Sequence, residues 1–532
     1  MGTGSGFVQT CAMSSTPSRI QVGELGTLRL PDLARIARGA CRVELADPAR
    51  ARLDDTRRWL LDTVSRGEVI YGVNTGFGAL SETTIPAEAL ATLQHNLLRS
   101  HAAGVGAPFP PEVVRVLLAL RAHTLALGAS GVSARIPEAL LDLLAHDLLP
   151  VVPSQGSVGA SGDLAPLAHL ALPLIGEGTV LSDGIPLDAG QALAAAGLAP
   201  VVLGPKEGLG LINGTQVTTA VGALAVVDAT ELVYAADIVA ALSLDAQLGS
   251  VGPFDPRIHR GKPHAGQVES ARIVRSLLEG SEINASHRDC GRVQDAYSLR
   301  CVPQIHGAVR NALAYVTACI ETEIDSFTDN PLVLARDDGG FDVRSGGNFH
   351  AITVAIPLDH LAAAVTTLAT ASERRTDRFM DPSTSRGLPP FLAEKPGLES
   401  GFMMWQVTAA ALASECKVLS HPAATDTIPT SAGKEDHVSM GPIAARKAAA
   451  VVEAATRCLA IEAATAARAI DLRAPKTSAP LAEVHACIRR HVRGEGGDRA
   501  MAGEIEDLAA AIRRGDLRRA AGLPNRFLGE TG

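Results

Sequence analysis

The amino-acid sequence predicts a mainly α-helical protein built as a bundle of long helices. Alanine and leucine dominate the chain, and apolar residues recur at helical spacing with charged residues between them. One such stretch, residues 442–473, reads PIAARKAAAVVEAATRCLAIEAATAARAIDLR and is longer than an ordinary globular helix. Strand signals are few and short. With 532 residues, 46% of them hydrophobic, the chain is large enough to bury an extensive core and to form several domains.

The chain divides into four predicted segments. These are a flexible Gly/Ser/Thr-rich tail at 1–20, an N-terminal domain at 21–215, a central long-helix bundle at 216–475 and a C-terminal helical segment at 476–532. Short strands are expected at 42–45 and 179–181. Long helices are expected at 111–127, 217–244, 310–326, 358–375, 401–420 and 442–473. Short capped connections between long helices are typical of helical bundles.

Composition excludes several classes of function. The net charge of -9 is spread over interspersed signs and aromatic residues make up only 3%, so no nucleic acid partner is expected. The eight cysteines include no CxxC pair, which argues against a disulfide framework and fits a reducing cytoplasm. The sequence shows neither a signal peptide nor an apolar run of about 18 residues, so no membrane span is expected. No metal is expected, because the histidines lack paired ligand spacing at 259, 264, 306 and 350.

Glycine and asparagine gather in a few connections between the predicted helices. These connections are YGVNTGFG at 71–78, GSVGASG at 156–162, GLGLINGTQ at 208–216 and SGGNFH at 345–350. Turning the chain does not require so many glycines. Loops held by a rigid scaffold often carry catalytic groups, so these connections are the candidate site.

The tetrapeptide GASG occurs twice, and its two contexts differ. The copy at 128–131 is followed by Pro137 and Glu138, which predict a helix end, a tight turn and a new helix. The copy at 159–162 is not a nucleophile elbow, because glycine follows the serine directly. Elsewhere, a dinucleotide fingerprint after Gly208 and Gly210 fails at Asn213, and a P-loop at Gly433-Lys434 fails because Ile428 replaces the preceding glycine. One interpretation of the copy at 159–162 is a helix start capped by Ser161 or Asp163. In the other, a tight bend lets the Gly162 nitrogen reach the Ala160 carbonyl. Loss of two waters would then leave a five-membered ring with an exocyclic methylene, an electrophile made from backbone.

Separated blocks along the chain carry a resemblance to a known family. They are YGVNTGFG at 71, RSHAAGVG at 99, GSVGASGDLAPLAH at 156, PKEGLGLINGTQ at 205, PFDPRIH at 253, VQDAYSLRCVPQ at 293, SGGNFHA at 345, SERR at 372 and TSAGKEDHVSMG at 430. From about residue 72 to 440 the chain resembles the aromatic amino acid ammonia-lyases and aminomutases that depend on 4-methylideneimidazol-5-one (MIO). The resemblance implies their helical-bundle fold and a homotetramer whose active sites combine three chains. It also implies that MIO forms from Ala160, Ser161 and Gly162, with no external cofactor.

The resemblance also implies roles for individual residues. Tyr71 would be the base that removes the β-proton, and Arg300 would pair with the substrate carboxylate. Asn213, Gln294 and Tyr297 would line the amine and MIO end, and Phe349 would contact the body of the substrate. These roles suit the chemistry, because a β-proton is weakly acidic, ammonia leaves poorly, and an arginine fork matches a carboxylate.

Two positions indicate which amino acid is the substrate. Ser100-His101 resembles the histidine-specific members of the family, and Glu435 in the KEDH stretch supports the same choice. Taken alone, His101 is more typical of a helix surface, and Glu435 is more typical of a capping residue. Together, an imidazole and a carboxylate can bond both ring nitrogens of histidine, whereas an apolar ring would leave them unpaired. Elimination would then give trans-urocanate and ammonia.

Two alternatives remain. An aminomutase, which returns ammonia to the β-carbon and makes a β-amino acid, shares all the blocks. The departures from the family pattern at Arg99, Ile352 and Trp405 bear on that choice, and Trp405 either narrows a pocket or fills core. A non-catalytic helical scaffold is disfavoured because the expected catalytic and binding side chains occur together.

Overall fold

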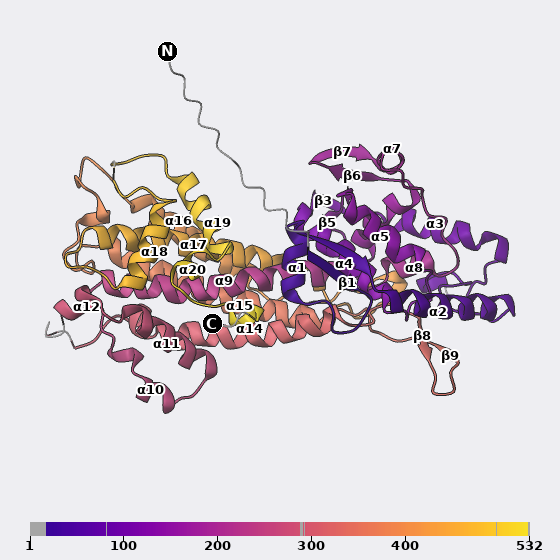
Figure 1. The fold of residues 1–532 in the computed structure, drawn as a ribbon, viewed down its shortest axis with the longest axis horizontal. Coiled ribbons are helices and arrows are strands. Elements are labelled where there is room, and N and C mark those ends of the chain that lie inside the picture. Colours follow the sequence, from indigo (N-terminus) through magenta and orange to yellow (C-terminus); the bar gives the residue numbers. More distant parts are fainter. Residues whose placement is uncertain (1–17, 81, 288–290, 292, 496, 530–532) are drawn as a thin grey trace, which may run out of the picture.

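The computed structural model describes residues 18–80, 82–287, 291, 293–495 and 497–529. The molecule is elongated, with the N-terminal elements gathered at one end and long helices running from them to the other end (Figure 1). The predicted mainly α-helical bundle is confirmed. Buried apolar side chains of both parts join in one continuous core.

The N-terminal part combines helices with small sheets. Its helices are α1 (Leu30–Ala37), α2 (Asp47–Ser65), α3 (Leu90–His101), α4 (Pro111–Ala126), α5 (Arg135–Ala145), α6 (Leu164–Ala171), α7 (Ala189–Ala195) and α8 (Glu207–Ile212). Its strands are β1 (Ser18–Val22), β2 (Cys41–Leu45), β3 (Val105–Pro108), β4 (Leu149–Pro150), β5 (Pro153–Gln155), β6 (Thr179–Ser182) and β7 (Ile185–Asp188). β1 pairs with β2 in parallel, β3 with β5 antiparallel, and β4, β6 and β7 form an antiparallel sheet.

The N-terminal part contains the two predicted strands and the predicted turn at the first GASG copy. The two predicted strands are β2 and β6. The predicted tail lies mostly outside the described residues, but residues 18–20 belong to β1, because backbone pairing with β2 orders them. The first GASG copy is the predicted turn, with Gly131 at φ +69° between α4 and α5.

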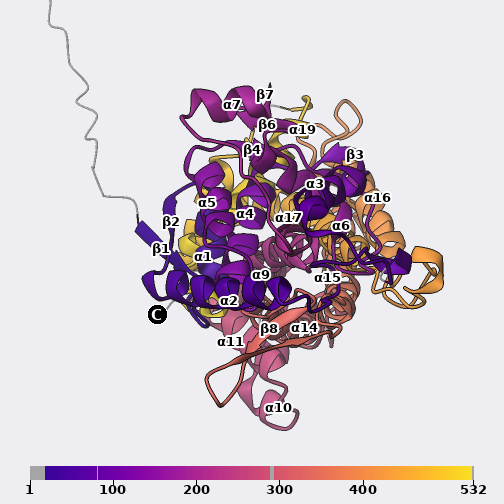
Figure 2. The same ribbon diagram turned by 90° about the vertical axis from the view of Figure 1, so that its right-hand side faces the viewer.

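Four long helices form the bundle: α9 (Gln216–Ala246), α14 (Val302–Ile324), α15 (Ile352–Met380) and α17 (Gly441–Asp471). α9 is buried on nearly all sides, with α15 and α17 beside it (Figure 2). Its 31 residues span about 46 Å at 1.5 Å per residue. α14 and α15 begin earlier than predicted because Pro303 fits a first turn and α15 continues through Pro357.

Among the described residues, α15 is the one helix that is long and apolar enough to cross a membrane. It packs instead against α9, α14, α16 and α17 inside the bundle. Burial in the protein core therefore explains the apolar composition of α15.

Shorter elements surround the bundle. The helices are α10 (Pro256–Arg260), α11 (Ala265–Leu278), α12 (Glu282–Ser286), α13 (Tyr297–Arg300), α16 (Met403–Leu419), α18 (Ala479–Arg489), α19 (Ala502–Arg513) and α20 (Asp516–Ala520). Strands β8 (Leu332–Ala335) and β9 (Phe341–Arg344) form a hairpin beside the N-terminal part (Figure 1).

Candidate active site

The glycines around Ser161 are required by the backbone. Gly159 and Gly162 have φ of +68° and +79°, in the left-handed region that favours glycine. A Cβ atom on Gly162 would overlap the backbone of Gly214, and one on Gly159 would overlap the hydroxyl of Ser439. The loop is therefore folded tightly against two other segments, and its backbone bends at positions that only glycine occupies easily.

Asp163 does not cap the following helix with its side chain, and neither does Ser161. Asp163 is the first flanking residue of α6, but its carboxyl accepts hydrogen bonds from Thr218, at 2.7 Å from the amide and 3.1 Å from the hydroxyl. Asp163 therefore occupies the predicted N-cap position, but its side chain does not cap α6, because the start of α9 offers this carboxyl two donors. Burial raises the pKa of Asp163 to about 7, while the Thr218 donors act in the opposite direction.

Asn213 lies directly behind this loop. Its neighbour Gly214 accepts a hydrogen bond of 2.8 Å from the Asp163 amide, and its own Nδ2 donates to the Asn330 carbonyl at 2.8 Å. Its buried Oδ1 accepts no hydrogen bond from any part of the chain that the structure describes. A tight Ala160–Gly162 bend beside an unused buried acceptor fits a backbone-derived electrophile that works on an amine.

A cavity of about 510 Å³ opens beside Ser161. Four predicted site residues line it: Tyr71, His101, Ser161 and Glu435. Its other lining residues include Phe77, Leu93, Asn96, Leu97, Ser100, Leu164, Leu209 and Ile212. Its volume and its mixture of apolar walls with a few polar groups are typical of a small-molecule site.

A polar loop holds Tyr71 at the cavity. Asn74 accepts from the Ile70 amide at 2.7 Å and donates to the Glu68 carbonyl at 2.8 Å, which closes the loop. The Gly78 amide donates to the Tyr71 hydroxyl oxygen at 3.3 Å. Such a donor stabilises negative charge on the oxygen that would act as base.

His101 ends α3 with a defined tautomer. Its Nδ1 lies 2.9 Å from the Leu97 carbonyl oxygen, which can only accept, so Nδ1 carries the proton and Nε2 is an acceptor. Burial lowers the pKa of His101, and the Leu97 carbonyl and the Glu435 charge oppose that shift. Burial thus favours the neutral imidazole.

Glu435 is held by a closed loop. Thr430 and Glu435 exchange backbone hydrogen bonds of 3.0 and 3.3 Å, and the Thr430 hydroxyl donates to Glu435 Oε2 at 2.6 Å. One carboxylate oxygen is thus engaged by Thr430. Glu435 is thus held in place, and it lines the same cavity as His101.

The structure does not bring Gln294, Tyr297 and Arg300 to this cavity. Tyr297 and Arg300 lie on α13, where the Arg300 guanidinium sits 4.8 Å from the centre of the Tyr297 ring. α14 then runs about 35 Å before Glu323 near its far end accepts from the Thr215 hydroxyl, two residues beyond Asn213. Tyr297 is 69% exposed and Gln294 is also exposed. Within one chain, these three residues are separated from Ser161 by the length of the bundle.

Phe349 takes an intermediate position. It is half-buried in the 345–350 loop, where the Gly346 amide donates to Asn330 Oδ1 at 2.8 Å. Asn330 also holds Asn213. The loop is thus tied to the back of the Ser161 loop, although Phe349 does not line the cavity.

Comparison with known proteins shows the family of the chain. A sequence model of the aromatic amino acid lyase family matches residues 28–490. The chain belongs to this family.

This chain is 52% identical to the histidine ammonia-lyase of Sorangium cellulosum over 496 residues. The aligned region covers 92% of this chain and 96% of that protein. The structure of histidine ammonia-lyase from Trypanosoma cruzi matches with a TM-score of 0.88 at 40% identity, over 97% of this chain and 98% of that one. Tyrosine aminomutase from Streptomyces globisporus matches at 0.89 and 36%, over 95% and 98%. The expected family and enzyme class are confirmed, and the protein is a carbon–nitrogen lyase.

The departures from the family pattern lie away from the cavity of this lyase. Arg99 forms an exposed ion pair with Glu177 at 2.6 Å. Trp405 is 4% exposed and packs edge-on against Phe402 at 5.1 Å, so it fills core. Ile352 packs against the core at the start of α15.

Sequence reasoning missed the residues that brace the Ser161 loop. Ser439 donates to the Gly159 carbonyl at 3.1 Å, and the Met440 amide donates to the Val158 carbonyl at 2.9 Å. Thr218 binds Asp163 as described. The SMG end of the block at 430 was the available signal for Ser439, but sequence does not show which loop it touches.

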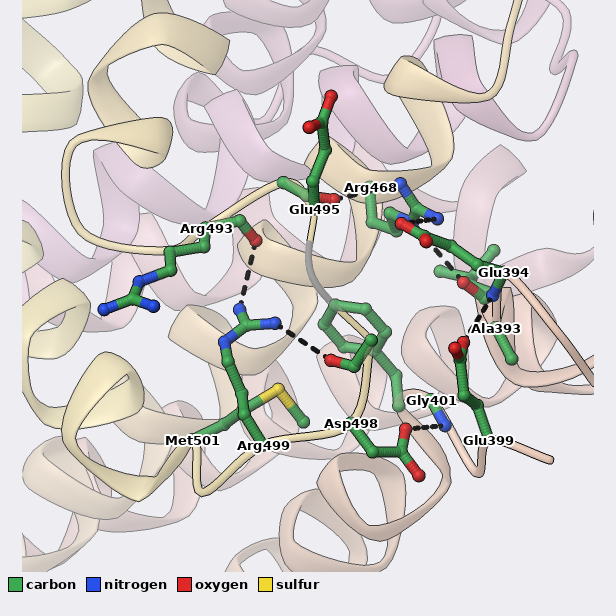
Figure 3. Close-up of a pocket in the computed structure, with 14 residues that line it drawn as sticks. Ala393, Glu394, Glu399, Gly401, Arg468, Arg493, Glu495, Asp498, Arg499 and Met501 are labelled. Carbon is green, nitrogen blue, oxygen red and sulfur yellow. Dashed lines mark hydrogen bonds and ion pairs between the residues drawn. The ribbon is translucent and has the colours of Figure 1, made fainter.

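A second pocket, at the other end of the bundle, is a poor candidate (Figure 3). Its cavity of about 30 Å³ holds little more than one water molecule. Two of the three arginines that line it form ion pairs within the chain: Arg468 contacts Glu394 at 3.3 Å, and Arg499 contacts Glu504 at 2.7 Å. No group of three or more potential metal ligands occurs among the described residues.

Proposed function

We propose that this lyase eliminates ammonia from L-histidine to give trans-urocanate. The observation that carries the proposal is the shared cavity, where Tyr71 and Ser161 lie with His101 and Glu435. The relatives named histidine ammonia-lyase, at 47–52% identity, support it. A protonated imidazole substrate can donate to both His101 and Glu435, whereas a phenyl ring would leave both unpaired.

Each proposed site residue has a distinct role in this reaction. The imidazole of the substrate donates its ring N–H to His101 Nε2, and Glu435 binds the other ring nitrogen when that nitrogen is protonated. Tyr71 accepts the β-proton. Arg300 binds the carboxylate as a fork, and Asn213, Gln294 and Tyr297 surround the amine, with Phe349 against the substrate body. MIO, formed from Ala160, Ser161 and Gly162 without an external cofactor, supplies the electrophile that turns the amine into a leaving group.

We further propose a homotetramer whose active sites combine three chains. The distance of α13 from the Ser161 cavity and the exposure of Tyr297 support this arrangement, because another chain must then supply Arg300. The N-terminal domain (21–215), the central bundle (216–475) and the C-terminal segment (476–532) are the proposed units, after the tail at 1–20. The proposed location is the cytoplasm. The unpaired thiols Cys41, Cys301, Cys319, Cys416, Cys458 and Cys487 fit its reducing conditions.

A MIO-dependent aminomutase is the second candidate. The fold similarity to tyrosine aminomutase, at a TM-score of 0.89, favours it. An aminomutase must retain its unsaturated intermediate long enough for ammonia to return. Arg99, Ile352 and Trp405 do not line the cavity, so they offer no special means of retention.

One experiment separates the candidates. Purified protein is incubated separately with L-histidine, L-tyrosine and L-phenylalanine, and mass spectrometry follows the unsaturated acid, ammonia and the β-amino acid. Urocanate and ammonia from histidine alone support the lyase proposal. A β-amino acid as the main product would establish an aminomutase, and an unmodified chain mass with no product would indicate a non-catalytic scaffold.

A further inference from the structure

A cluster of buried charged side chains crosses the bundle at the end where α13 lies. We call Asp237, His306, Arg310, Arg375 and Glu462 the bundle cluster; all are at most 4% exposed. They come from α9, α14, α15 and α17. Arg310 binds Asp237 at 2.7 Å, and Arg375 binds Glu462 through two hydrogen bonds of 2.6 and 2.9 Å. The two cations and two carboxylates balance, as burial requires.

His306 connects the two ion pairs in one defined protonation state. Its Nδ1 lies 2.8 Å from Asp237 Oδ1, and its Nε2 lies 3.3 Å from Arg375 Nη1. A guanidinium only donates and an ionised carboxylate only accepts, so Nδ1 carries the proton and Nε2 accepts from Arg375. Burial and the Arg375 charge both lower the pKa of His306, which agrees with a neutral ring.

Arg375 extends the bundle cluster to the short helix α13. The same Nη1 atom donates to the Ser298 carbonyl oxygen at 3.3 Å. Two further contacts fix this segment: Leu299 is 1% exposed, and Asp295 accepts from the Ser250 amide at 2.7 Å. Tyr297, on the opposite side, is 69% exposed. One face of α13 is thus anchored in the bundle while the other presents its side chains outward.

We propose that Arg375 is a positioning residue that, held by Glu462 and His306, fixes the helix bearing Tyr297 and Arg300 and so sets the affinity of the site for the substrate carboxylate. The inference rests on the proposed role of Arg300. It also explains the SERR block, whose last residue is Arg375. The preceding Arg374 points elsewhere and pairs with Glu373 at 2.5 Å, with 58% of its side chain exposed.

Only an arginine can make all of these contacts together. Its planar fork binds Glu462 with Nε and Nη2, while Nη1 remains for His306 and Ser298. A lysine keeps the charge and can neutralise Glu462, but a single ammonium cannot reach both sides. Arg375→Lys therefore releases the Ser298 carbonyl without leaving Glu462 uncompensated.

The test compares Arg375→Lys with Arg518→Lys in the full-length protein. Arg518 is matched, because it is 4% exposed, binds the Glu231 carboxylate at 2.9 Å and donates to the Leu523 carbonyl at 2.8 Å. The KM for L-histidine is measured together with the inhibition constant of L-histidinol, which has a hydroxymethyl group in place of the carboxylate. A chain mass about 36 Da below the sequence value reports that the Ser161 end has folded and formed its ring.

The expected result for Arg375→Lys is a KM for L-histidine raised about tenfold, the size of one weakened charged hydrogen bond, and an L-histidinol constant within about twofold of wild type. Arg518→Lys should retain the wild-type KM. Glu462→Gln removes the charge that holds Arg375, so it should also raise the KM for L-histidine. This variant tests the inference if Arg375→Lys does not fold.

Three results would overturn the inference: an unchanged KM with only kcat reduced, a parallel rise of both constants, or an equal KM shift in Arg518→Lys. Failure of the proposed function is a separate result, because it is seen with the wild-type protein. If wild type acts on another amino acid, the same comparison is made with that substrate and its amino alcohol.

Discussion

Ser161 and Gly162 are needed for different physical reasons. Gly162 is required because its φ of +79° and the adjacent Gly214 backbone leave no room for a Cβ atom. Ser161 lines the cavity, and in the proposed reaction its side chain loses a water to become the electrophilic methylene. The backbone thus explains the glycines, and the chemistry explains the serine.

Ser161→Ala is expected to lower kcat for L-histidine by about a thousandfold or more, because the principal electrophilic stabilisation of the reaction is lost. The variant should also have an unmodified chain mass, whereas wild type should be about 36 Da lighter than its sequence. Ser130→Ala, in the other GASG copy, is the matched control and should keep both activity and the mass loss. A fully active Ser161→Ala protein would refute the assignment.

The pH dependence should reflect His101. Its folded pKa is lowered by burial from the ordinary 6.5, so folding favours the neutral ring. Stability from this residue is therefore present above pH 6.5 and lost as the pH falls through the folded pKa. Urea unfolding between pH 7 and pH 5 should show a steeper loss for wild type than for His101→Gln. Identical slopes would contradict the assignment, and kcat/KM should fall over the same range because His101 Nε2 no longer accepts.

At the scale of elements, the helix ends bring the site together. The start of α9 binds Asp163, the end of α3 carries His101, and the loop before α17 braces the Ser161 loop through Ser439. Each side chain is thus held by an element whose own position is set by the core. The N-terminal part and the bundle meet at this junction.

Asp163→Ala should destabilise this junction. It leaves the Thr218 amide and hydroxyl buried without their acceptor, at a cost of about 1–3 kcal/mol. Urea unfolding should report that loss, and intact mass should show a larger share of unmodified chain, because the loop is no longer held in its bend. Asp188→Ala, which removes the exposed cap of α7, is the comparison and should leave the chain mass at its wild-type value. Complete ring formation in Asp163→Ala would separate this carboxyl from loop closure.

At the scale of the whole molecule, the length of α14 bears on which of the proposed site residues one chain can bring together. α14 is about 35 Å long, and it lies between α13 at one end and the contact of Glu323 with Thr215, near the Ser161 loop, at the other. The proposed set of catalytic and binding residues therefore requires more than one chain. The bundle thus contributes the buried core and also keeps α13 apart from the Ser161 cavity of the same chain.

Mixed oligomers should reveal this sharing. Ser161→Ala and Arg300→Ala proteins are each expected to be nearly inactive, while their co-expression should restore about a quarter of wild-type activity, since both intact groups meet at about one site in four. Activity is measured on oligomers purified through two different tags. Separately expressed proteins mixed just before the assay are the control. If co-expression restores nothing, the sites do not combine chains in the proposed way.

The sequence by itself determined the helical class and the family, because helical periodicity and the glycine-rich blocks are local patterns of residues. From the same blocks it predicted the chemistry that we propose for the Ser161 loop. It also indicated His101 and Glu435, whose side chains suit imidazole. Only the tertiary structure decided that Asp163 binds Thr218 rather than capping α6, that Trp405 fills core, and that Tyr297 lies far from Ser161. Those facts depend on which segments distant in sequence pack together, and packing is a property of the folded chain.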